Sequence, residues 1–216
     1  MKKSVTAQFV VYIAVLLIAI CGSLGLIANT TASNALINSI EQQLPSKAND
    51  GANIVASRIE ARLESVVTLA NMPVMESMDW PAQFNILANE QERLEFLHMG
   101  VAASDGECRF TNGTIINLLD RDYFMRALAG ESCMSDPIIN RIDGSLNFAF
   151  ASPIYDDNEQ VQGVLVGLSD SFELSEIVQS VTFGESGYAF VLNKEGTTIA
   201  HPNTDLVINR DNDFEN

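Results

Sequence analysis

Two runs, LNFAFASPIYD at residues 146–156 and QVQGVLVGLS at residues 160–169, decide the fold of this chain. Both have the length and the branched or aromatic content of strands, and Asp156-Asp157-Asn158 between them is typical of a turn. In the first run Phe148 and Phe150 alternate with alanines, so the two rings share one face and line either the core or a cavity. The runs therefore predict two strands of an antiparallel sheet.

Three more strands are expected around these two. They read EFLHMGVAA from residue 95, CRFTNG from residue 108 after an Asp-Gly turn, and CMSDPIINRI from residue 133. Together the segments predict an α+β fold, with a five-stranded antiparallel sheet and flanking helices that we expect on one side of the sheet.

Two helices are expected between and after the strands. Asp120 is a suitable N-cap for the first helix, and Gly130 is a suitable residue just past its last turn. Asp170 is a suitable N-cap for the second helix, with Glu173 as its capping-box partner, and this helix is expected to run to about Val181.

The N-terminal part contains a run long enough to cross a membrane. Residues 9–28 carry no charge, and about 20 helical residues at 1.5 Å each span a bilayer core of ~30 Å. Lys2 and Lys3 precede this run, so the positive-inside rule places the N-terminus in the cytoplasm and the chain after about residue 30 outside. A cleaved signal peptide is the alternative, but its apolar region is usually only about 7–15 residues long, so we favour an uncleaved anchor.

A long amphipathic segment follows the membrane run. The sequence stays compatible with helix to Pro45, and a second helical segment is expected from about residue 50 to residue 72, where Pro73 stops it. Apolar residues recur at spacings of three and four along one side, and charged residues lie mostly on the other. The apolar stripe is Val55, Ile59, Leu63, Val66 and Ala70, and the charged residues are Arg58, Glu60, Arg62 and Glu64. We expect the stripe to pack on the chain's own domain, on a partner copy, or on both.

Composition and residue types exclude several classes of function. The chain has 12 Lys+Arg against 28 Asp+Glu, a formal net charge of −16 at pH 7, so its surface repels nucleic acid and anionic membranes. No nucleophile arrangement adjoins His98 or His201, and no cluster has metal-ligand spacing, so we expect no catalytic residue, metal or cofactor. The sequence leaves open whether Cys108 and Cys133 form a disulfide.

Five phrases together resemble the double Cache sensor domain of bacterial transmembrane receptors, especially methyl-accepting chemotaxis proteins and membrane diguanylate cyclases. In chain order they are LDRDYFMRALAGES, SDPIIN, FAFASPIYDD, VQGVLVG and FGESGYAFVLNKEGTTIAHPN, within residues 33–216. The last phrase begins the pattern of strand, turn and strand again, with Gly196 ending the turn.

The resemblance implies PAS-like modules carried on a membrane-anchored stalk. Its parts are a cytoplasmic tail at 1–8, a helix through the bacterial cytoplasmic membrane at 9–29, a stalk helix at 30–75, a membrane-distal module at 76–182 and the first hairpin of a membrane-proximal module at 183–216. We expect the native protein to continue beyond Asn216 into a chemotaxis signalling region, a cyclase or a histidine kinase. A receptor of this type is expected to be a homodimer with the stalk stripe near the two-fold axis.

The resemblance also implies a ligand site in the membrane-distal module. In an amino-acid-binding version of the family, an arginine and two aromatic residues hold the ligand carboxylate, and Arg121, Tyr123 and Phe124 match them. Two acids hold the ligand ammonium there, and their positions fall near Asn140 and Leu168, which are uncharged. The resemblance and these two uncharged positions therefore predict a small carboxylate ligand that lacks an α-amine, or another small polar ligand.

Each site residue also has a structural interpretation. Arg121 either anchors the ligand or forms a surface ion pair with Asp120, Asp122 or a strand carboxylate, and Tyr123 and Phe124 lie either in the core or at the pocket. Further candidates for the ligand site, each with a structural alternative, are Asp136, Phe148, Phe150, Ser152 and Asp170.

Three functions follow from these observations. The first is a sensory binding module that passes a ligand signal through the stalk helix. The second, a secreted or anchored hydrolase, lacks an acid pair, metal cluster or triad with usable spacing. The third, a structural or adhesive ectodomain, does not explain the phrases of the ligand site. We therefore favour the sensory module.

Overall fold

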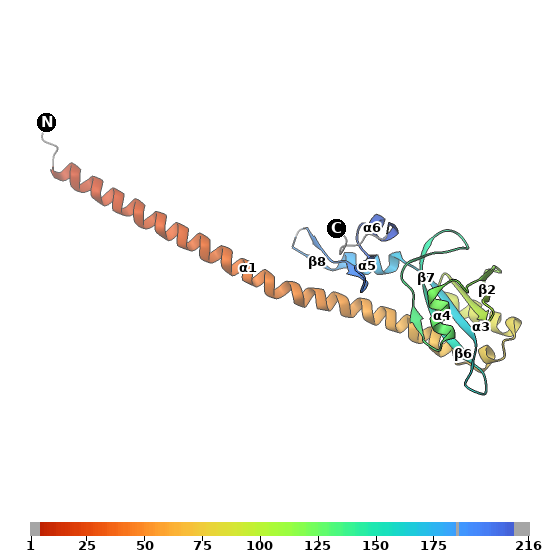
Figure 1. The fold of residues 1–216 in the computed structure, drawn as a ribbon. Helices are drawn as coiled ribbons and strands as arrows, with labels where there is room; N and C mark the ends of the chain where they lie inside the picture. The colour runs from red at the N-terminus through yellow and green to blue at the C-terminus, as the bar shows by residue number, and fades with distance from the viewer. Residues whose placement is uncertain (1–4, 185, 210–216) are drawn as a thin grey trace. The chain divides into compact units, whose positions relative to one another are not determined.

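The computed structural model describes residues 5–184 and 186–209, with side chains from Tyr12 onward (Figure 1). The chain divides into two compact units, Met1–Ala48 and Asn49–Asn216. The division falls inside the first helix, α1 (Val5–Ala70).

In the first unit α1 is an exposed, apolar helix. Every side chain from residue 12 to residue 38 is exposed, and this part is long and apolar enough to cross a membrane by length and composition. Pro45 lies inside the helix, so the expected break there is wrong. A proline removes one intrahelical hydrogen bond, and neighbours such as Glu41 and Lys47 favour helix strongly enough to continue it.

The second unit contains the rest of α1, five further helices and a sheet. The further helices are α2 (Pro73–Glu76), α3 (Trp80–Arg93), α4 (Asp122–Leu128), α5 (Phe172–Ser180) and α6 (Thr204–Ile208). The sheet strands are β1 (His98–Ala103), β2 (Glu107–Phe110), β3 (Ile115–Asn117), β4 (Cys133–Met134), β5 (Ile138–Ile139), β6 (Leu146–Tyr155) and β7 (Val161–Asp170).

All strand pairs in this sheet are antiparallel, as predicted, and β7 lies at its centre between β1 and β6. The strand order is β3-β2-β1-β7-β6-β4, and β5 also pairs with β6. The expected strand at 133–142 is interrupted, because Pro137 cannot donate a ladder hydrogen bond, and it becomes β4 and β5. The expected strands are present, and β3 is an additional edge strand.

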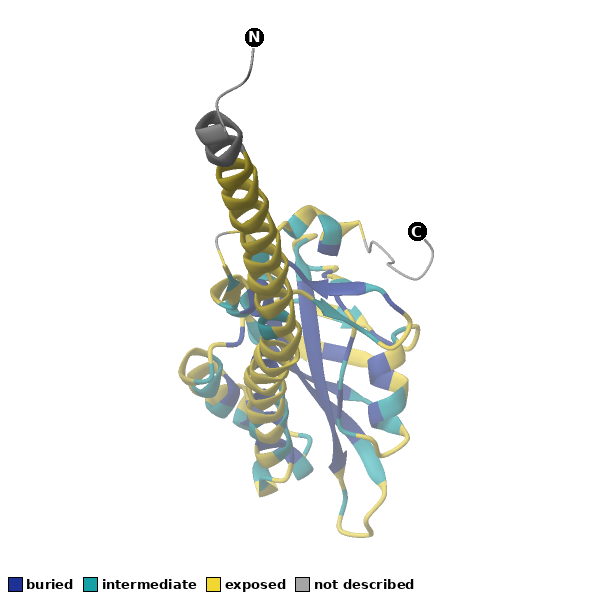
Figure 2. Ribbon diagram, turned by 90° about the vertical axis from the view of Figure 1, so that its left-hand side faces the viewer, coloured by how far each residue is buried: buried dark blue, intermediate teal, exposed yellow. Residues whose placement is uncertain are grey.

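The sheet is buried on both faces, which Figure 2 shows as nearly continuous burial along the central strands. On one face, here called the stalk face, Phe148 and Phe150 pack with α1, α3 and α5. On the opposite face, here called the α4 face, Ala149 and Ala151 pack with α4. Helices therefore cover both faces, and the expectation of helices on one side is wrong.

The apolar stripe of α1 packs on the stalk face of its own sheet. Val55, Val66 and Ala70 are 4%, 0% and 3% exposed, and Ile59 and Leu63 pack against the same core. The stripe therefore packs on the chain's own domain, which is the first of the alternatives expected from the sequence.

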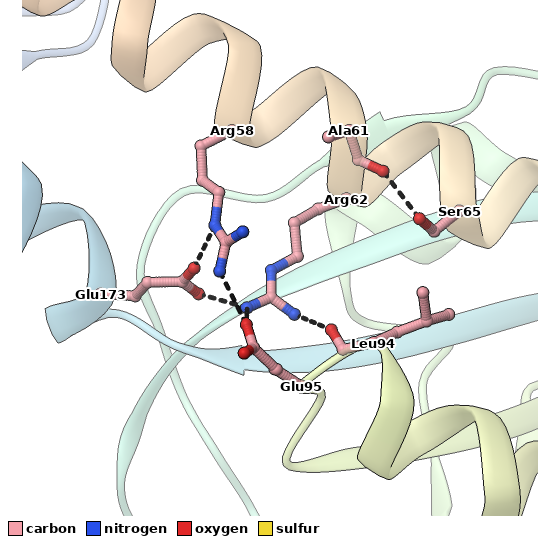
Figure 3. Close-up of polar contacts among 7 residues, drawn as sticks. All are labelled: Arg58, Ala61, Arg62, Ser65, Leu94, Glu95 and Glu173. Carbon is pink, nitrogen blue, oxygen red and sulfur yellow. Dashed lines mark hydrogen bonds and ion pairs between the residues drawn. The ribbon is translucent and has the colours of Figure 1, made fainter.

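Two arginines of α1, Arg58 and Arg62, point toward Glu173 of α5 and toward Leu94 and Glu95, which precede β1 (Figure 3). The Arg58 guanidinium donates to Glu173 Oε1 at 2.5 Å and to Glu95 Oε2 at 2.8 Å. Arg62, 6% exposed, donates to Glu173 Oε2 at 2.8 Å and to the Leu94 carbonyl, and its guanidinium lies 5.1 Å from the centre of the Phe96 ring. The placement of Arg62 among the solvent-facing residues is therefore wrong, since it joins α1 to α5 and to the start of β1.

The start of α5 differs from its prediction. Ser171 occupies the N-cap position, while the Asp170 carboxylate accepts from the Phe172 N–H at 2.9 Å. Glu173 binds the two α1 arginines, the exposed Arg58 and the buried Arg62, and does not form the predicted capping box, because these two cations compete for its carboxylate.

The repeated pattern predicts one hairpin with its turn at Gly196, and the described residues form that hairpin and a second short one before it. β8 (Thr182–Phe183) pairs with β9 (Gly187–Tyr188), and β10 (Val191–Leu192) pairs with β11 (Thr198–Ala200). Gly196 has a φ of +85° in the turn before β11, a conformation that favours glycine.

We predict that Arg62→Met lowers the free energy of unfolding by about 3 kcal/mol, because it removes one partner of a buried ion pair and leaves Glu173 undercompensated. Urea unfolding of the full chain in detergent measures this loss. Arg109→Met is the matched control, since Arg109 and its partner Glu107 are both 50% exposed, and its loss should stay below about 1 kcal/mol. Equal losses in the two variants would contradict the structural role of Arg62.

Candidate functional site

Local backbone hydrogen bonds place Arg121 at the start of α4. The Arg121 N–H donates to the Leu118 carbonyl at 2.9 Å, and the side-chain oxygen of Asn117 accepts from the Leu119 N–H at 3.0 Å. Arg121 is the N-cap residue of α4, with extended backbone, so its side chain leaves the chain before the helix begins. Gly130, with a φ of +97°, follows the last turn, as predicted.

Asp120 does not cap α4, so that prediction is wrong. Its carboxylate forms an exposed ion pair with Arg141, and hydrogen bonding to this guanidinium lowers the pKa of Asp120. Because Asp120 pairs with Arg141, it does not pair with Arg121. The other neighbouring acid, Asp122, has its Oδ2 at 3.9 Å from Nη1 of Arg126. Among the described residues Arg121 forms no ion pair, so the surface ion-pair interpretation is wrong.

The Arg121 guanidinium is only partly satisfied. One terminal nitrogen, Nη2, donates to the Ile139 carbonyl at 3.0 Å. Its Nε is buried and has no hydrogen-bond partner among the described residues. A buried donor without a partner costs about 1–3 kcal/mol, so the guanidinium has capacity for another acceptor.

Tyr123 and Phe124 follow Arg121 into the first turn of α4 and lie in the core of the α4 face. They are 3% and 0% exposed, and burial raises the pKa of the Tyr123 hydroxyl. These two buried rings follow Arg121 closely in the chain. Apolar side chains of this kind lower the local dielectric, which strengthens the hydrogen bonds of a nearby guanidinium.

Asn140 follows Ile139, the residue whose carbonyl Arg121 holds. It is 4% exposed, and its Oδ1 accepts from the Ile142 N–H at 2.9 Å. This bond fixes the other amide atom as Nδ2, a buried donor that has no partner in the described part of the chain. Ile138 and Ile142, on either side of Asn140, pack against the core of the α4 face.

Leu168 and His98 are partners across the β1–β7 pair, at the end of β7 and the start of β1. Leu168 is 3% exposed and belongs to the core of the α4 face, so it offers no polar atom. His98 Nδ1 is buried and unpartnered among the described residues. The hydrogen bonds from Ser145 lower the pKa of the Asp143 carboxyl, and the charge of His98 contributes a smaller lowering.

Sequence reasoning considered His98 only as a catalytic residue and missed this position. The alternation of side chains along β1 could have located it. His98 and Ala102 are four residues apart on this strand, so they point to the same face of the sheet, and Ala102 packs on the α4 face. We call the group Arg121, Asn140, His98 and Leu168 the α4 corner. Three of the five buried, unpartnered side-chain atoms in the described residues belong to it.

Other predicted site residues lie elsewhere. Phe148 and Phe150 lie in the core of the stalk face, on the opposite side of the sheet from Tyr123 and Phe124. Ser152 is two residues beyond Phe150 on β6 and therefore points to the same face of the sheet. It is 2% exposed and shares a 3.1 Å hydrogen bond with Ser132. Strand alternation separates all three from the α4 corner.

The two candidate acids are both exposed and engaged in other contacts. Asp136 accepts from the side chain of Asn193 at 3.1 Å, and Asp170 accepts from the Phe172 N–H. Neither therefore supplies a buried acceptor for an ammonium group.

The two cysteines are buried free thiols, so a disulfide between them is wrong. Cys108 lies on β2 and Cys133 on β4, with β1, β7 and β6 between them. Neighbouring strands lie about 4.8 Å apart, so the sheet holds these residues far beyond the reach of a disulfide. Burial raises the pKa of both thiols.

A hollow is lined by other residues of the same unit. It has a volume of about 410 Å³ and opens between the start of α3 and strands β1 and β2, where Trp80, Val101 and Arg109 contribute to its walls. Its lining has no buried polar atom without a partner among the described residues, so we rank the α4 corner above it.

In chemical terms the α4 corner contains donors and a cation but lacks a buried carboxylate. Such a set suits an anion with oxygen atoms, since a guanidinium binds a carboxylate through charge-assisted hydrogen bonds. Within residues 5–184 and 186–209 no cluster of three or more His, Cys, Asp or Glu side chains could hold a metal ion.

Comparison with known proteins gives a family and a set of similar folds. A family model described as Cache domain matches residues 32–215. The methyl-accepting chemotaxis protein PscA of Pseudomonas syringae pv. tomato is 31% identical over 80 residues, which are 37% of this chain and 13% of PscA. The matched segment is thus a small part of that relative.

Solved chemoreceptor domains share the fold. The ligand-binding domain of Pseudomonas fluorescens CtaA with L-serine has a TM-score of 0.72 at 16% identity, over 82% of this chain and 78% of that one. Pseudomonas aeruginosa PctB with L-Arg has a TM-score of 0.67 at 20% identity, over 80% and 74%. PctC of the same organism with GABA has a TM-score of 0.66 at 20% identity, over 82% of each chain.

The family model covers most of the chain, including both the sheet with its two helical layers and the hairpins after it. The antiparallel sheet and the long N-terminal helix agree with the chemoreceptor domains of similar fold. The chain therefore belongs to the Cache domain family, in its double Cache form.

Proposed function

We propose that this chain is the ligand-sensing region of a transmembrane chemotaxis receptor and that it binds a small carboxylate at the α4 corner. One observation carries the proposal: the partly unsatisfied Arg121 guanidinium donates to the carbonyl of Ile139, and the next residue, Asn140, has a buried amide nitrogen without a partner among the described residues. A carboxylate supplies the acceptors that both groups lack.

Positions 140 and 168 lack the acidic residues that would bind an ammonium group, and this favours a carboxylate ligand without an α-amine. An ammonium group needs buried acceptors, but position 168 is leucine and the free atom of Asn140 is a donor. Among the receptors of similar fold, PctC was solved with GABA, whose amine is not on the α-carbon. PctC shares the fold of this chain, so its ligand supports the proposal by analogy.

For the membrane, we propose a cytoplasmic tail at 1–8, a span at 9–29 and a stalk at 30–75, with the chain after about residue 30 outside the bacterial cytoplasmic membrane. The exposed apolar part of α1 and the lysines before it support this arrangement. The two modules then cover 76–182 and 183–216.

Signal transfer is proposed to run through the ends of β1 and β7. His98 and Leu168 belong to the α4 corner, and three residues before His98, Glu95 holds both arginines of α1. A ligand shifts the stalk only if its affinity differs between two arrangements of these strand ends. The arginine contacts give α1 a direct connection to them.

The output is proposed to lie beyond Asn216, as a chemotaxis signalling region, with a diguanylate cyclase or histidine kinase as the alternative. PscA, a methyl-accepting chemotaxis protein, favours the first. We propose no catalytic activity for residues 1–216.

We predict that Arg121→Ala weakens carboxylate binding about 10- to 100-fold, because charge-assisted hydrogen bonds contribute about 1.5–3 kcal/mol. Calorimetry on the full chain in nanodiscs, with propionate and L-alanine as ligands, measures the effect. Arg126→Ala is the matched control, since Arg126 lies in the same helix and pairs with Glu131. Tighter binding of L-alanine than of propionate, or full affinity after Arg121→Ala, would reject the proposal.

We also propose a homodimer that forms through the exposed side of α1. Ile54 is 52% exposed whereas the next residue, Val55, is 4% exposed. In membranes, on a Cys21→Ser background, Ile54→Cys should crosslink to a second copy and Val55→Cys should not. A failure of Ile54→Cys to crosslink, or equal crosslinking of both variants, would contradict this arrangement.

A further inference from the structure

The hollow between the start of α3 and the β1–β2 hairpin has the size of a small-molecule site. Its volume of about 410 Å³ falls within the range of about 300–1,000 Å³ that such sites occupy. Val101 of β1 lines it and packs in the core of the stalk face, whereas Leu168 of the α4 corner packs in the core of the α4 face. The hollow is therefore a site separate from the α4 corner.

The carboxylate of Asp79 is left without a partner in the lining of this hollow. Asp79 is the N-cap residue of α3 and has extended backbone, but its side chain accepts no capping hydrogen bond. A capping carboxylate binds the N–H of the second or third helical residue, and the second residue here is Pro81, which has no N–H. Among the described residues the Asp79 carboxylate also forms no ion pair, so it is free to bind a cation.

Gln83 adds a second acceptor to the lining. Its side chain is 1% exposed, and its Nε2 donates to the Met75 carbonyl at 2.9 Å. This bond fixes the other amide atom as Oε1, to which no group donates in the described part of the chain. Unlike the sealed atoms of the α4 corner, this oxygen keeps contact with solvent. The hollow thus offers two acceptors, on Asp79 and Gln83, to a ligand that carries N–H groups.

Trp80 gives the hollow an aromatic surface. It follows Asp79 directly, is half-buried, and packs on the core of the stalk face. Its ring also meets the ring of Phe84 in an edge contact, with the centroids 5.9 Å apart. The face of a tryptophan ring attracts an ammonium group electrostatically. Met78 and Val101 add apolar surface to the same lining, which suits the hydrocarbon part of such a ligand.

The charges around the hollow favour a cation. Arg109 lines it too, but its Nη2 donates to Glu107 Oε1 at 3.0 Å, so this pair is neutral as a whole. The N-terminus of α3 carries about half a positive charge, which the full negative charge of Asp79 outweighs. At long range the formal charge of −16 attracts cations to the domain.

We propose that this hollow binds a small organic ammonium ion. Asp79 and Gln83 accept from its N–H groups, and the Trp80 ring stabilises its charge. The apolar residues Met78 and Val101 cover its hydrocarbon part. This second ligand goes beyond the proposed function and does not depend on it, because the α4 corner takes no part in the site.

Two cyclohexane derivatives test the requirement for a positive charge, because they share one ring and differ in one substituent. Cyclohexylammonium is a cation and cyclohexanol is neutral. Trp80 is the only tryptophan of the chain, so the tryptophan fluorescence of the full chain in dodecyl maltoside reports on this hollow. At constant ionic strength, cyclohexylammonium should change the emission with a Kd at least about 10-fold lower than that of cyclohexanol.

Substitutions assign the binding to named side chains. Asp79→Asn should weaken cyclohexylammonium binding about 10-fold and leave the circular dichroism of the chain unchanged, because this carboxylate does not cap α3. Glu92→Gln is the matched control, since Glu92 is an exposed acid of the same helix outside the lining, and it should keep full affinity. Trp80→Leu, measured by calorimetry, should weaken binding of the ammonium ion about 5-fold without changing that of cyclohexanol.

Three outcomes would overturn the proposal. Equal affinity for cyclohexylammonium and cyclohexanol would make the hollow an apolar site without selectivity for charge. No response to cyclohexylammonium at millimolar concentration would remove the site altogether. Equal affinities of Asp79→Asn and Glu92→Gln for the ammonium ion would show that the Asp79 carboxylate does not bind it. A carboxylate that still bound at the α4 corner would leave the proposed function standing in each case.

Discussion

The alternation of side chains along β6 and β7 is the constraint on which the rest of this module depends. Both strands are ten residues long and buried on both faces along most of their length, and their buried apolar side chains fall into two separate cores. A slip of one residue would exchange the large rings of Phe148 and Phe150 for the alanines between them and empty one core while it overfilled the other. This register therefore fixes which residues face α4 and which face α1.

The two faces have different chemistry, and the strand ends connect them. On the stalk face Arg62 is buried, and its cost in desolvation is offset by Glu173, by the Leu94 carbonyl and by the face of the Phe96 ring. On the α4 face three buried side-chain atoms, in His98, Arg121 and Asn140, lack a partner among the described residues, whereas the Arg62 guanidinium on the stalk face lacks one only at Nε. The polar groups on the two faces of the sheet are therefore satisfied to different degrees. An arrangement of this kind favours a fixed attachment to α1 and a ligand on the other side.

Local chemistry explains which parts of this structure were predictable from the sequence. The strand runs, the glycine turns and the end of α4 at Gly130 depend on neighbouring residues, and their patterns are visible in the chain. Contacts between distant segments were not predictable in this way. Asp120 has all the properties of an N-cap but binds Arg141, and Arg62 has the helical position of a solvent-facing residue but meets Glu173, 111 residues later. His98 required knowledge of its strand partner before its position at the site could be identified.

The net charge of the chain adds a final constraint on the ligand. With a formal charge of −16, the domain repels anions at long range, so its field does not help to collect a carboxylate. Affinity for an anion must then come from contacts within a few ångström, where burial removes solvent screening and a single guanidinium outweighs distant charges. Arg121 and Asn140 meet this requirement because their free donors are buried. Leaving them unpaired costs about 1–3 kcal/mol for each group in the empty domain, and an oxygen-bearing anion recovers that cost on binding. The same unpaired donors that lower the stability of the empty site therefore make it selective for such a ligand.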